Sequence, residues 1–175
     1  MVGLANGSPV VAENNVTENE VVAQQIAVAA IKYTILKIAA GKDIVFDLKK
    51  SVSFEGDSGP YLQYTYARIQ SVLEKAAQAG VVPSTELSPN TAYAVEKLVE
   101  RFPSVIATAL TDRAPHTVVT YLTELASEFN SFYAEEKIAD PSDEFAPYKA
   151  AVAQAVALTL KQGLWTLGIK APERM

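Results

Sequence analysis

The chain has 175 residues, of which 49% are apolar, enough for one globular domain with a buried core. It has no cysteine, which excludes disulfides, thiolate nucleophiles and cysteine-ligated metals. Its formal net charge is −5, so bulk attraction does not hold it to nucleic acid, and such a role needs local basic and aromatic patches or a second domain. We find no membrane-spanning run and no signal-peptide pattern, and we therefore expect a cytoplasmic protein.

The amino-terminal part divides at Thr17. Residues 1–16 mix Gly, Asn, Ser and Pro without periodicity, which indicates a flexible lead-in or a cloning remnant, and 17–175 form the folded domain. Thr17 and Glu20 form a capping box that starts a helix running to about Ala40, where Gly41 stops it. Residues 43–47 are predicted to be extended. The range 17–50 therefore consists of a connecting helix followed by an extended segment. The predicted buried stripe of this helix is Val22, Ile26, Val28, Ile31, Ile35 and Ile38.

The stretch around which the chain is organised is a glycine-rich loop followed by a helix, residues 54–79. Gly56 and Gly59 permit a tight loop, and Pro60 suits the first helical position, with Ser58 or Gly59 as the cap. Gly80 stops the helix. At 100° per residue, one face of it is predicted to be buried and carries Leu62, Tyr66, Ile69, Leu73 and Ala76.

A second face of the same helix carries aromatic rings, a hydroxyl and cations. Rings interleaved with cations suit a partner that has both π-faces and phosphates, which describes nucleic acid. The same spacing is equally compatible with tyrosines that pack against a neighbouring helix. The residues of this face are Tyr61, Tyr64, Arg68, Ser71 and Lys75.

The rest of the chain is helical by its apolar periodicity. A helix starts at Ser88-Pro89 and is broken by Pro103, and a short one follows with Val105, Ile106 and Leu110 inward. Another begins at Pro115 and is followed by a loop over 140–147. The last helix runs from about Tyr148 to Leu167, is capped by Gly168 and packs Trp165 into the bundle. About six helices predict an all-α helical bundle.

Side chains for catalysis are scarce. His116 is the single histidine, which rules out paired-histidine motifs, and no glycine-rich phosphate cradle follows a strand. Asp112 and His116 are four residues apart, but Pro115 between them disfavours a shared helical face. We therefore predict no catalytic residue and no metal site, and we expect His116 to bond a nearby backbone carbonyl.

Several segments resemble the class I arginyl-tRNA synthetases, specifically their C-terminal anticodon-binding domain of the DALR type. Gly56-Asp57-Ser58-Gly59-Pro60-Tyr61-Leu62-Gln63-Tyr64-Thr65-Tyr66-Ala67-Arg68-Ile69 is similar to the segment leading into that domain. The residues from Gly163 to Met175 look like the family's carboxyl terminus. Further matches are Ala30-Ile31-Lys32-Tyr33, Pro115-His116, Tyr121-Leu122-Thr123-Glu124-Leu125-Ala126 and Phe132-Tyr133.

The resemblance implies a parent protein that is an ATP-dependent arginine–tRNA ligase. The family's His-x-Gly-His and Lys-Met-Ser motifs are absent here, so the chain alone is predicted to be inactive and to need no cofactor, with ATP and Mg used by the parent. The implied partners are the anticodon stem-loop of arginine tRNA and the missing N-terminal catalytic domain of the same protein, and the fragment is expected to be monomeric.

The resemblance also implies which residues bind tRNA. By periodicity alone Phe129 and Tyr133 are core residues, and Met175 is either a frayed terminus or part of a docked tail. Two departures from the family are Tyr148-Lys149-Ala150, where an arginine is usual, and Phe129, where some relatives have tyrosine. The predicted tRNA-binding residues are Tyr61, Tyr64, Arg68, Lys75, Phe129, Tyr133 and Met175, and the predicted anticodon-arm loop is Phe54, Glu55, Gly56, Asp57, Ser58 and Gly59.

One alternative from a different functional class stays open. The chain could be a non-catalytic helical module that docks another protein through Tyr61, Tyr64 and Arg68. Salt separates the two hypotheses, because RNA binding weakens steeply as salt rises and an aromatic protein interface responds weakly.

Overall fold

The computed structural model describes residues 17–175, and the predicted lead-in over 1–16 lies outside the described residues. The described part contains α-helices and no strand. The helices are α1 (Glu18–Leu36), α2 (Leu48–Ser51), α3 (Gly59–Gln78), α4 (Ala94–Asp112), α5 (Pro115–Glu135) and α6 (Ala146–Thr166). The prediction of an all-α bundle is confirmed.

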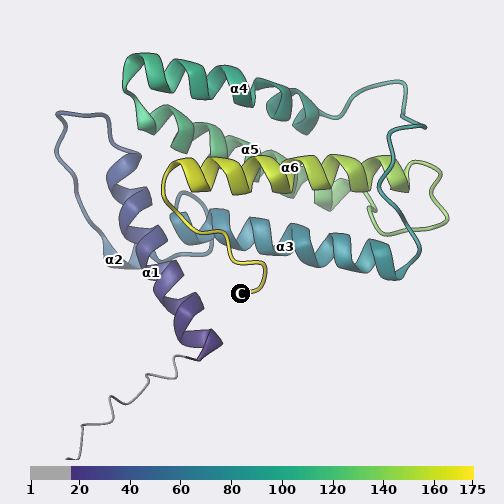
Figure 1. The fold of residues 1–175 in the computed structure, drawn as a ribbon, viewed down its shortest axis with the longest axis horizontal. Helices are drawn as coiled ribbons and strands as arrows, with labels where there is room; N and C mark the ends of the chain where they lie inside the picture. The colour runs from purple at the N-terminus through teal and green to yellow at the C-terminus, as the bar shows by residue number, and fades with distance from the viewer. Residues whose placement is uncertain (1–16) are drawn as a thin grey trace, which may run out of the picture.

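Four long helices lie roughly side by side, and α1 crosses them at one end (Figure 1). α3 packs on α6, α5 packs on both α4 and α6, and α1 packs on α3. Their shared core is aliphatic and aromatic, with Leu62, Ile69, Leu122, Phe129 and Leu160 all fully buried. This arrangement leaves one side of α3 open to solvent.

α1 begins as predicted but buries a different face. Thr17 and Glu20 form the expected capping box, and the helix ends at Leu36, before the predicted Ala40. The predicted buried stripe is wrong for Val28, Ile31 and Ile35, which are exposed, whereas its other members Val22, Ile26 and Ile38 are partly buried. The buried residues are Ala29, Ala30, Tyr33 and Thr34.

Close approach of α1 and α3 explains this choice of face. At Gly59 an added Cβ would lie only 2.3 Å from the backbone oxygen of Ala29. Small residues at both positions therefore let the two helices touch backbone to backbone. Larger side chains at these two positions would hold the helices apart, and the exposed Ile31 and Ile35 lie on the opposite side of α1.

α3 follows its prediction closely. Ser58 is the N-cap, Pro60 lies in the first turn, and Gly80, with φ of 82°, ends the helix after Ala79. Leu62, Tyr66, Ile69 and Ala76 are buried, and Leu73 is partly buried. The helix thus presents the second face, with Tyr64 and Arg68, away from the core.

α4 corrects three predictions. The helix begins at Ala94 rather than near Pro89, and it continues through Pro103 to Asp112 instead of breaking there. Pro103 is exposed. Phe102 stacks on Tyr121 of α5, whose hydroxyl donates to the backbone oxygen of Leu98, and this packing compensates for the hydrogen bond that a proline cannot donate. Leu110, predicted to point inward, is 80% exposed.

α6 and the tail complete the bundle. Trp165 is 75% exposed, so its predicted packing inside the bundle is wrong, and Gly163 and Leu164 occupy the buried positions instead. Gly168, with φ of 67°, turns the chain back, and Ile169 is buried. The residues that follow lie along the bundle as a docked tail (Figure 1).

Candidate nucleic-acid interface

The second face of α3 is open and carries a preassembled cation–aromatic pair. The Tyr64 side chain is 38% exposed, and the Arg68 guanidinium carbon lies 4.8 Å from the centre of its ring. Arg68 Nη2 also lies 3.3 Å from the Tyr64 hydroxyl. Ser71 and Lys75 continue the face and are exposed. A flat ring and a charge are therefore presented together to solvent.

Asn130 of α5 holds the pair formed by Tyr64 and Arg68 in position. Arg68 Nη1 donates to Asn130 Oδ1 at 2.8 Å, and Asn130 Nδ2 donates to the Tyr61 hydroxyl at 2.9 Å. Tyr61 is only partly exposed, so its role is chiefly to hold this network in place. Sequence reasoning missed Asn130. Its signal was a poor helix former in the last turns of α5, directly after the buried Phe129.

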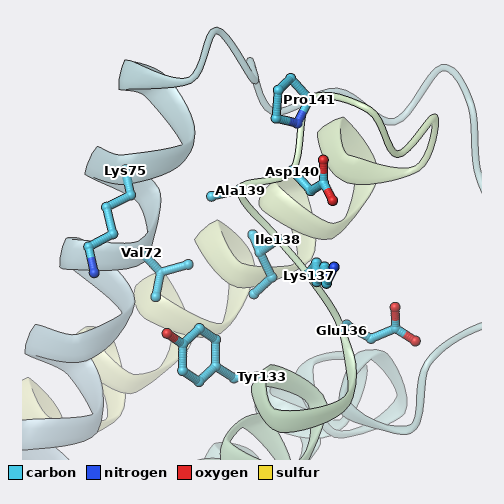
Figure 2. Close-up of a pocket in the computed structure, with 9 residues that line it drawn as sticks. All are labelled: Val72, Lys75, Tyr133, Glu136, Lys137, Ile138, Ala139, Asp140 and Pro141. Atoms are coloured by element: carbon cyan, nitrogen blue, oxygen red, sulfur yellow. The ribbon is translucent and has the colours of Figure 1, made fainter.

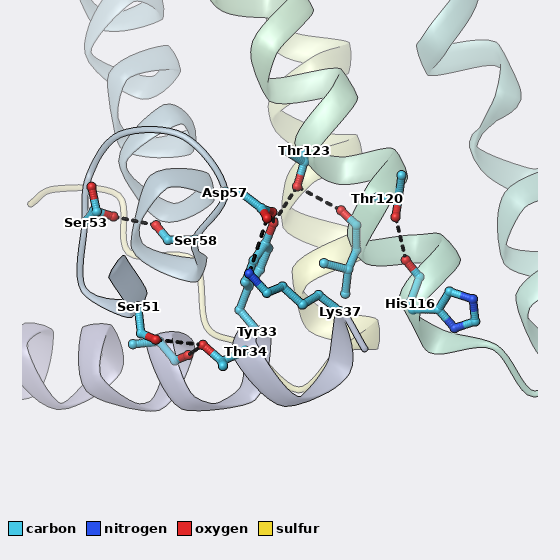
Figure 3. Close-up of polar contacts among 12 residues, drawn as sticks. Tyr33, Thr34, Lys37, Ser51, Ser53, Asp57, Ser58, His116, Thr120 and Thr123 are labelled. Atoms are coloured by element: carbon cyan, nitrogen blue, oxygen red, sulfur yellow. Dashed lines mark hydrogen bonds and ion pairs between the residues drawn. The ribbon is translucent and has the colours of Figure 1, made fainter. Parts of the chain in front are cut away.

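The loop over 54–59 borders the same face. Phe54 is half-exposed and meets the Tyr64 ring edge-on, with centroids 6.0 Å apart. Gly56, with φ of 76°, supplies the left-handed turn that the loop needs. The Ser58 hydroxyl donates to the backbone oxygen of Ser53, which closes the loop on itself (Figure 3).

Asp57 anchors this loop to the carboxyl-terminal end of α1 and, through Tyr33, to α5. Its carboxylate accepts from the Tyr33 hydroxyl and from Lys37, the latter at 3.3 Å (Figure 3). The Tyr33 hydroxyl also lies 2.7 Å from Thr123 Oγ1 of α5. Burial, together with the bond to Asp57, raises the pKa of Tyr33 well above its usual value. Tyr33 thus stays a neutral donor, and the loop has a fixed place beside α3.

The carboxyl terminus forms one wall of a groove on α3. Tyr64, Ala67, Arg68, Ser71, Glu74, Arg174 and Met175 line this groove of about 570 Å³. Arg174 lies 3.6 Å from Glu74, and Met175 is about half-exposed. The structure therefore brings Met175, which is distant in sequence, beside Tyr64 and Arg68 of α3, and all three are predicted residues.

The tail is held in this position by a buried glutamine. Gln63 is fully buried, and its Nε2 donates to the backbone oxygen of Lys170 at 2.7 Å and to that of Gln25 at 3.2 Å. Lys32 of α1 donates to the backbone oxygen of Gly168. Sequence reasoning missed Gln63, and its position on the buried side of α3 was the available signal.

A second groove lies further along α3 and brings together Lys75 and Tyr133 (Figure 2). It measures about 430 Å³, and the segment from Glu136 to Pro141 forms its other wall. Tyr133 is 39% exposed. Lys137, which sequence reasoning did not single out, adds another cation to the lining.

Phe129 corrects the predicted set of contacts. It is fully buried, with 0% of its surface exposed, so it cannot stack on a base. Its ring lies parallel to that of Tyr133, with centroids 6.3 Å apart and an angle of 11°. Phe129 therefore belongs to the inner face of α5, as its periodicity indicated, and supports the exposed tyrosine from beneath.

A buried lysine fixes the segment that walls the second groove. Lys149 of α6 is 8% exposed, and its Nζ lies 2.5 Å from Glu136 and 2.6 Å from Asp143. Burial alone would lower the pKa of Lys149, but its bonds to Asp143 and Glu136 raise it above the usual value. The bonds from Lys149 and the Phe145 amide hold the pKa of Asp143 below its usual range.

His116 differs from its prediction. Its Nδ1 is buried without a hydrogen-bond partner among residues 17–175, so the expected bond to a backbone carbonyl is not made there. Within the described residues, no group of three or more His, Cys, Asp or Glu side chains could hold a metal ion. No helix in this part of the chain is long and apolar enough to cross a membrane.

The fold is that of the helical anticodon-binding domains. The chain belongs to the DALR anticodon binding domain family, whose model matches residues 62–175. The match begins in the first turn of α3 and continues through the tail, so it includes both grooves.

Relatives point in the same direction. The chain is 38% identical over 166 residues to an arginine–tRNA ligase of Streptococcus pneumoniae, an alignment that covers 94% of this chain and 29% of that protein. The chain therefore spans less than a third of the length of the curated relatives it matches.

Solved structures agree on the fold. Arginyl-tRNA synthetase of Thermus thermophilus superposes with a TM-score of 0.74 at 30% identity, covering 93% of this chain and 29% of that one. A putative arginyl-tRNA synthetase of Campylobacter jejuni gives a TM-score of 0.74 at 24% identity, over 89% of this chain and 35% of that one. At that identity the likeness concerns the fold alone.

Proposed function

We propose that this chain is the tRNA-binding part of an arginine–tRNA ligase and that it binds the anticodon stem-loop of arginine tRNA through the open face of α3. The observation that carries the proposal is the convergence of Tyr64, Arg68 and Met175 on one groove and of Tyr133 and Lys75 on the next, along a single helix. Membership of the DALR anticodon binding domain family supports it.

The chemistry of this face suits single-stranded loop RNA. Unpaired bases stack on exposed aromatic rings, here Tyr64 and Tyr133, and base–aromatic stacking contributes about 1–3 kcal/mol per base. Cations beside the rings contact phosphates, which position the RNA without reading its sequence. The cations near the two grooves are Arg68, Lys75, Lys137 and Arg174.

The parent ligase would use the remaining part of its chain for chemistry. That part would bind ATP and Mg and attach arginine to the tRNA, in the cytoplasm. Binding at the anticodon would hold the acceptor end in the catalytic domain, so that energy gained far from the reaction helps the chemical step. We expect the present chain by itself to be monomeric and to catalyse nothing.

The experiment that tests the proposal is a titration of arginine tRNA transcript against the chain at low salt. A transcript with altered anticodon bases runs beside it, and both titrations are repeated over a salt series. Weaker binding of the altered transcript, with a steep salt dependence, is the expected result. Equal binding of both transcripts would contradict anticodon recognition. If this face binds another protein with little salt dependence and does not bind RNA, the alternative of a protein-docking module is favoured instead.

A further inference from the structure

Gln63 is a polar residue at a position where an apolar side chain would stabilise the fold more. Its side chain is fully buried. Its Nε2 donates to two backbone carbonyls, whereas its Oε1 is buried without a hydrogen-bond partner among residues 17–175. A buried acceptor that has no partner costs stability, and an apolar side chain of similar shape avoids that cost. Residues that break the rules of core packing in this way are expected where function requires them.

The two carbonyls that Gln63 binds belong to different parts of the chain. One is the backbone oxygen of Gln25 in α1, at 3.2 Å, and the other is that of Lys170 in the tail, at 2.7 Å. Both partners are acceptors, so only the amide nitrogen of Gln63 can serve them, and the orientation of the side chain is fixed. Gln63 therefore joins α3, α1 and the tail at one point.

The ion pairs of the tail beyond Lys170 are exposed. Lys161 pairs with Glu173 at 3.7 Å, and Glu74 pairs with Arg174 at 3.6 Å. All four side chains are more than half exposed, and exposed ion pairs contribute little to stability. The position of the last residues therefore depends more on the bond from Gln63 than on these ion pairs.

We propose that Gln63 is a positioning residue for tRNA binding, which acts through the tail to place Met175 in the groove on α3. This inference rests on the proposed function, because the affinity that Gln63 governs is the affinity for tRNA. Met175 lines that groove with Tyr64 and Arg68, and Tyr64 follows Gln63 directly in α3. The same turn of α3 thus presents a ring to the RNA on its exposed side and fixes the tail on its buried side.

The first part of the test follows the tail in the absence of RNA. The sequence has two methionines, Met1 and Met175, so a chain labelled at its methionine methyl groups gives few signals, and deletion of residues 171–175 identifies that of Met175. Gln63→Leu removes the donor and keeps a buried side chain of similar size. The Met175 signal should move to the position of a methionine free in solvent, with little change in melting temperature.

The second part measures affinity for the arginine tRNA transcript. Gln63→Leu should weaken binding about tenfold, as much as deletion of residues 171–175, and the two changes together should cost no more than either alone. Such non-additivity distinguishes a residue that acts through the tail from one that only stabilises the fold.

A matched control makes the comparison specific. Gln78→Leu places the same substitution at an exposed position of α3 and should alter neither the methyl signal nor the affinity. If Gln63→Leu does not fold, Gln63→Asn replaces it. This variant keeps a buried amide but is one methylene too short to reach both carbonyls, and the same results are expected of it.

Three outcomes would overturn the inference. These are an unmoved Met175 signal in the folded Gln63 variant, losses of affinity that add to those of the deletion, and equal effects of Gln63→Leu and Gln78→Leu. A failure of the proposed function looks different, because the unsubstituted chain then binds both tRNA transcripts equally or not at all, whatever the methyl signal shows.

Discussion

Tyr64 and Tyr133 each present a partly exposed ring. The Tyr64 ring contacts Phe54 and Arg68, and the Tyr133 ring packs on the buried Phe129. Replacing either tyrosine by alanine removes a stacking platform and leaves the core untouched. We therefore expect Tyr64→Ala and Tyr133→Ala each to cost about 1–3 kcal/mol of RNA affinity, measured by titration, with an unchanged unfolding midpoint.

Phe129→Ala is the control for that prediction. Because this ring is fully buried, its removal should lower the free energy of unfolding by about 3–5 kcal/mol. If Tyr64→Ala or Tyr133→Ala destabilises the fold to a similar extent, that tyrosine is structural and does not serve the interface.

Substitutions of Arg68 and Asn130 distinguish the effect of the Arg68 charge from the effect of its position. Arg68→Ala removes a phosphate-binding cation and should reduce the magnitude of the salt slope of RNA binding by about 1. Asn130→Ala only releases the guanidinium and the Tyr61 hydroxyl, so affinity should fall while the slope stays unchanged. The measurement is binding over a salt series, and a slope unaltered by Arg68→Ala would show that Arg68 contacts no phosphate.

At the scale of elements, two glycines allow close helix packing. A Cβ at Gly59 would meet the backbone of Ala29, which cannot move without separating α1 from α3. A Cβ at Gly163 would meet the end of the Leu122 side chain, at 2.4 Å from Cδ2, and a side chain can rotate. Gly59→Ala should therefore cost at least about 3 kcal/mol and Gly163→Ala about 1–2 kcal/mol of unfolding free energy. Chemical denaturation measures both, and the reverse order would contradict the backbone contact.

Lys149, Glu136 and Asp143 form a charged cluster that joins the segment after α5 to α6. The stability that this cluster contributes depends on pH. The pKa of Asp143 is lowered in the folded state. Its contribution to the free energy of unfolding is therefore present above the usual carboxyl pKa of about 4 and is lost as pH falls through the lowered value. The pKa of Lys149 is raised, so its contribution is present below about 10.4 and is lost as pH rises through the raised value.

Lys149→Met should therefore destabilise the chain by about 3 kcal/mol at neutral pH, because two carboxylates lose their buried partner. The difference from the unsubstituted chain should stay constant from about pH 5 to 9 and shrink below about pH 4. Denaturation curves over this range are the measurement. A difference that grows in acid would mean that the cluster is not what stabilises this segment.

At the scale of the whole molecule, the carboxyl terminus crosses the bundle to reach α3. Deleting residues 171–175 removes Met175 and Arg174 from the groove but leaves the buried Ile169 and the bond from Gln63 to Lys170. RNA affinity should drop about tenfold, or about 1.4 kcal/mol, with little change in melting temperature. Unchanged affinity would remove the tail from the proposed interface.

Short sequence motifs predicted where most helices begin and end, but not which helix faces pack together. The Thr17 capping box, Ser58 with Pro60, and Gly80 mark helix ends by backbone chemistry that acts within a few residues, and all were predicted. Pro103 was predicted to break a helix, yet packing of α4 on α5 outweighs its local preference. The two faces of α1 are both apolar, so periodicity could not choose between them, and the approach of Gly59 to Ala29 did.

The helical class, the family resemblance and the two faces of α3 can all be recognised in the amino-acid sequence, because periodicity and short motifs are properties of neighbouring residues. Which of those residues contact one another depends on how the helices pack. This packing placed Met175 beside Tyr64 and Arg68, buried Phe129 beneath Tyr133, and left Trp165 in solvent. The physical reason is that burial depends on which helices touch, and those contacts join residues that are distant along the chain.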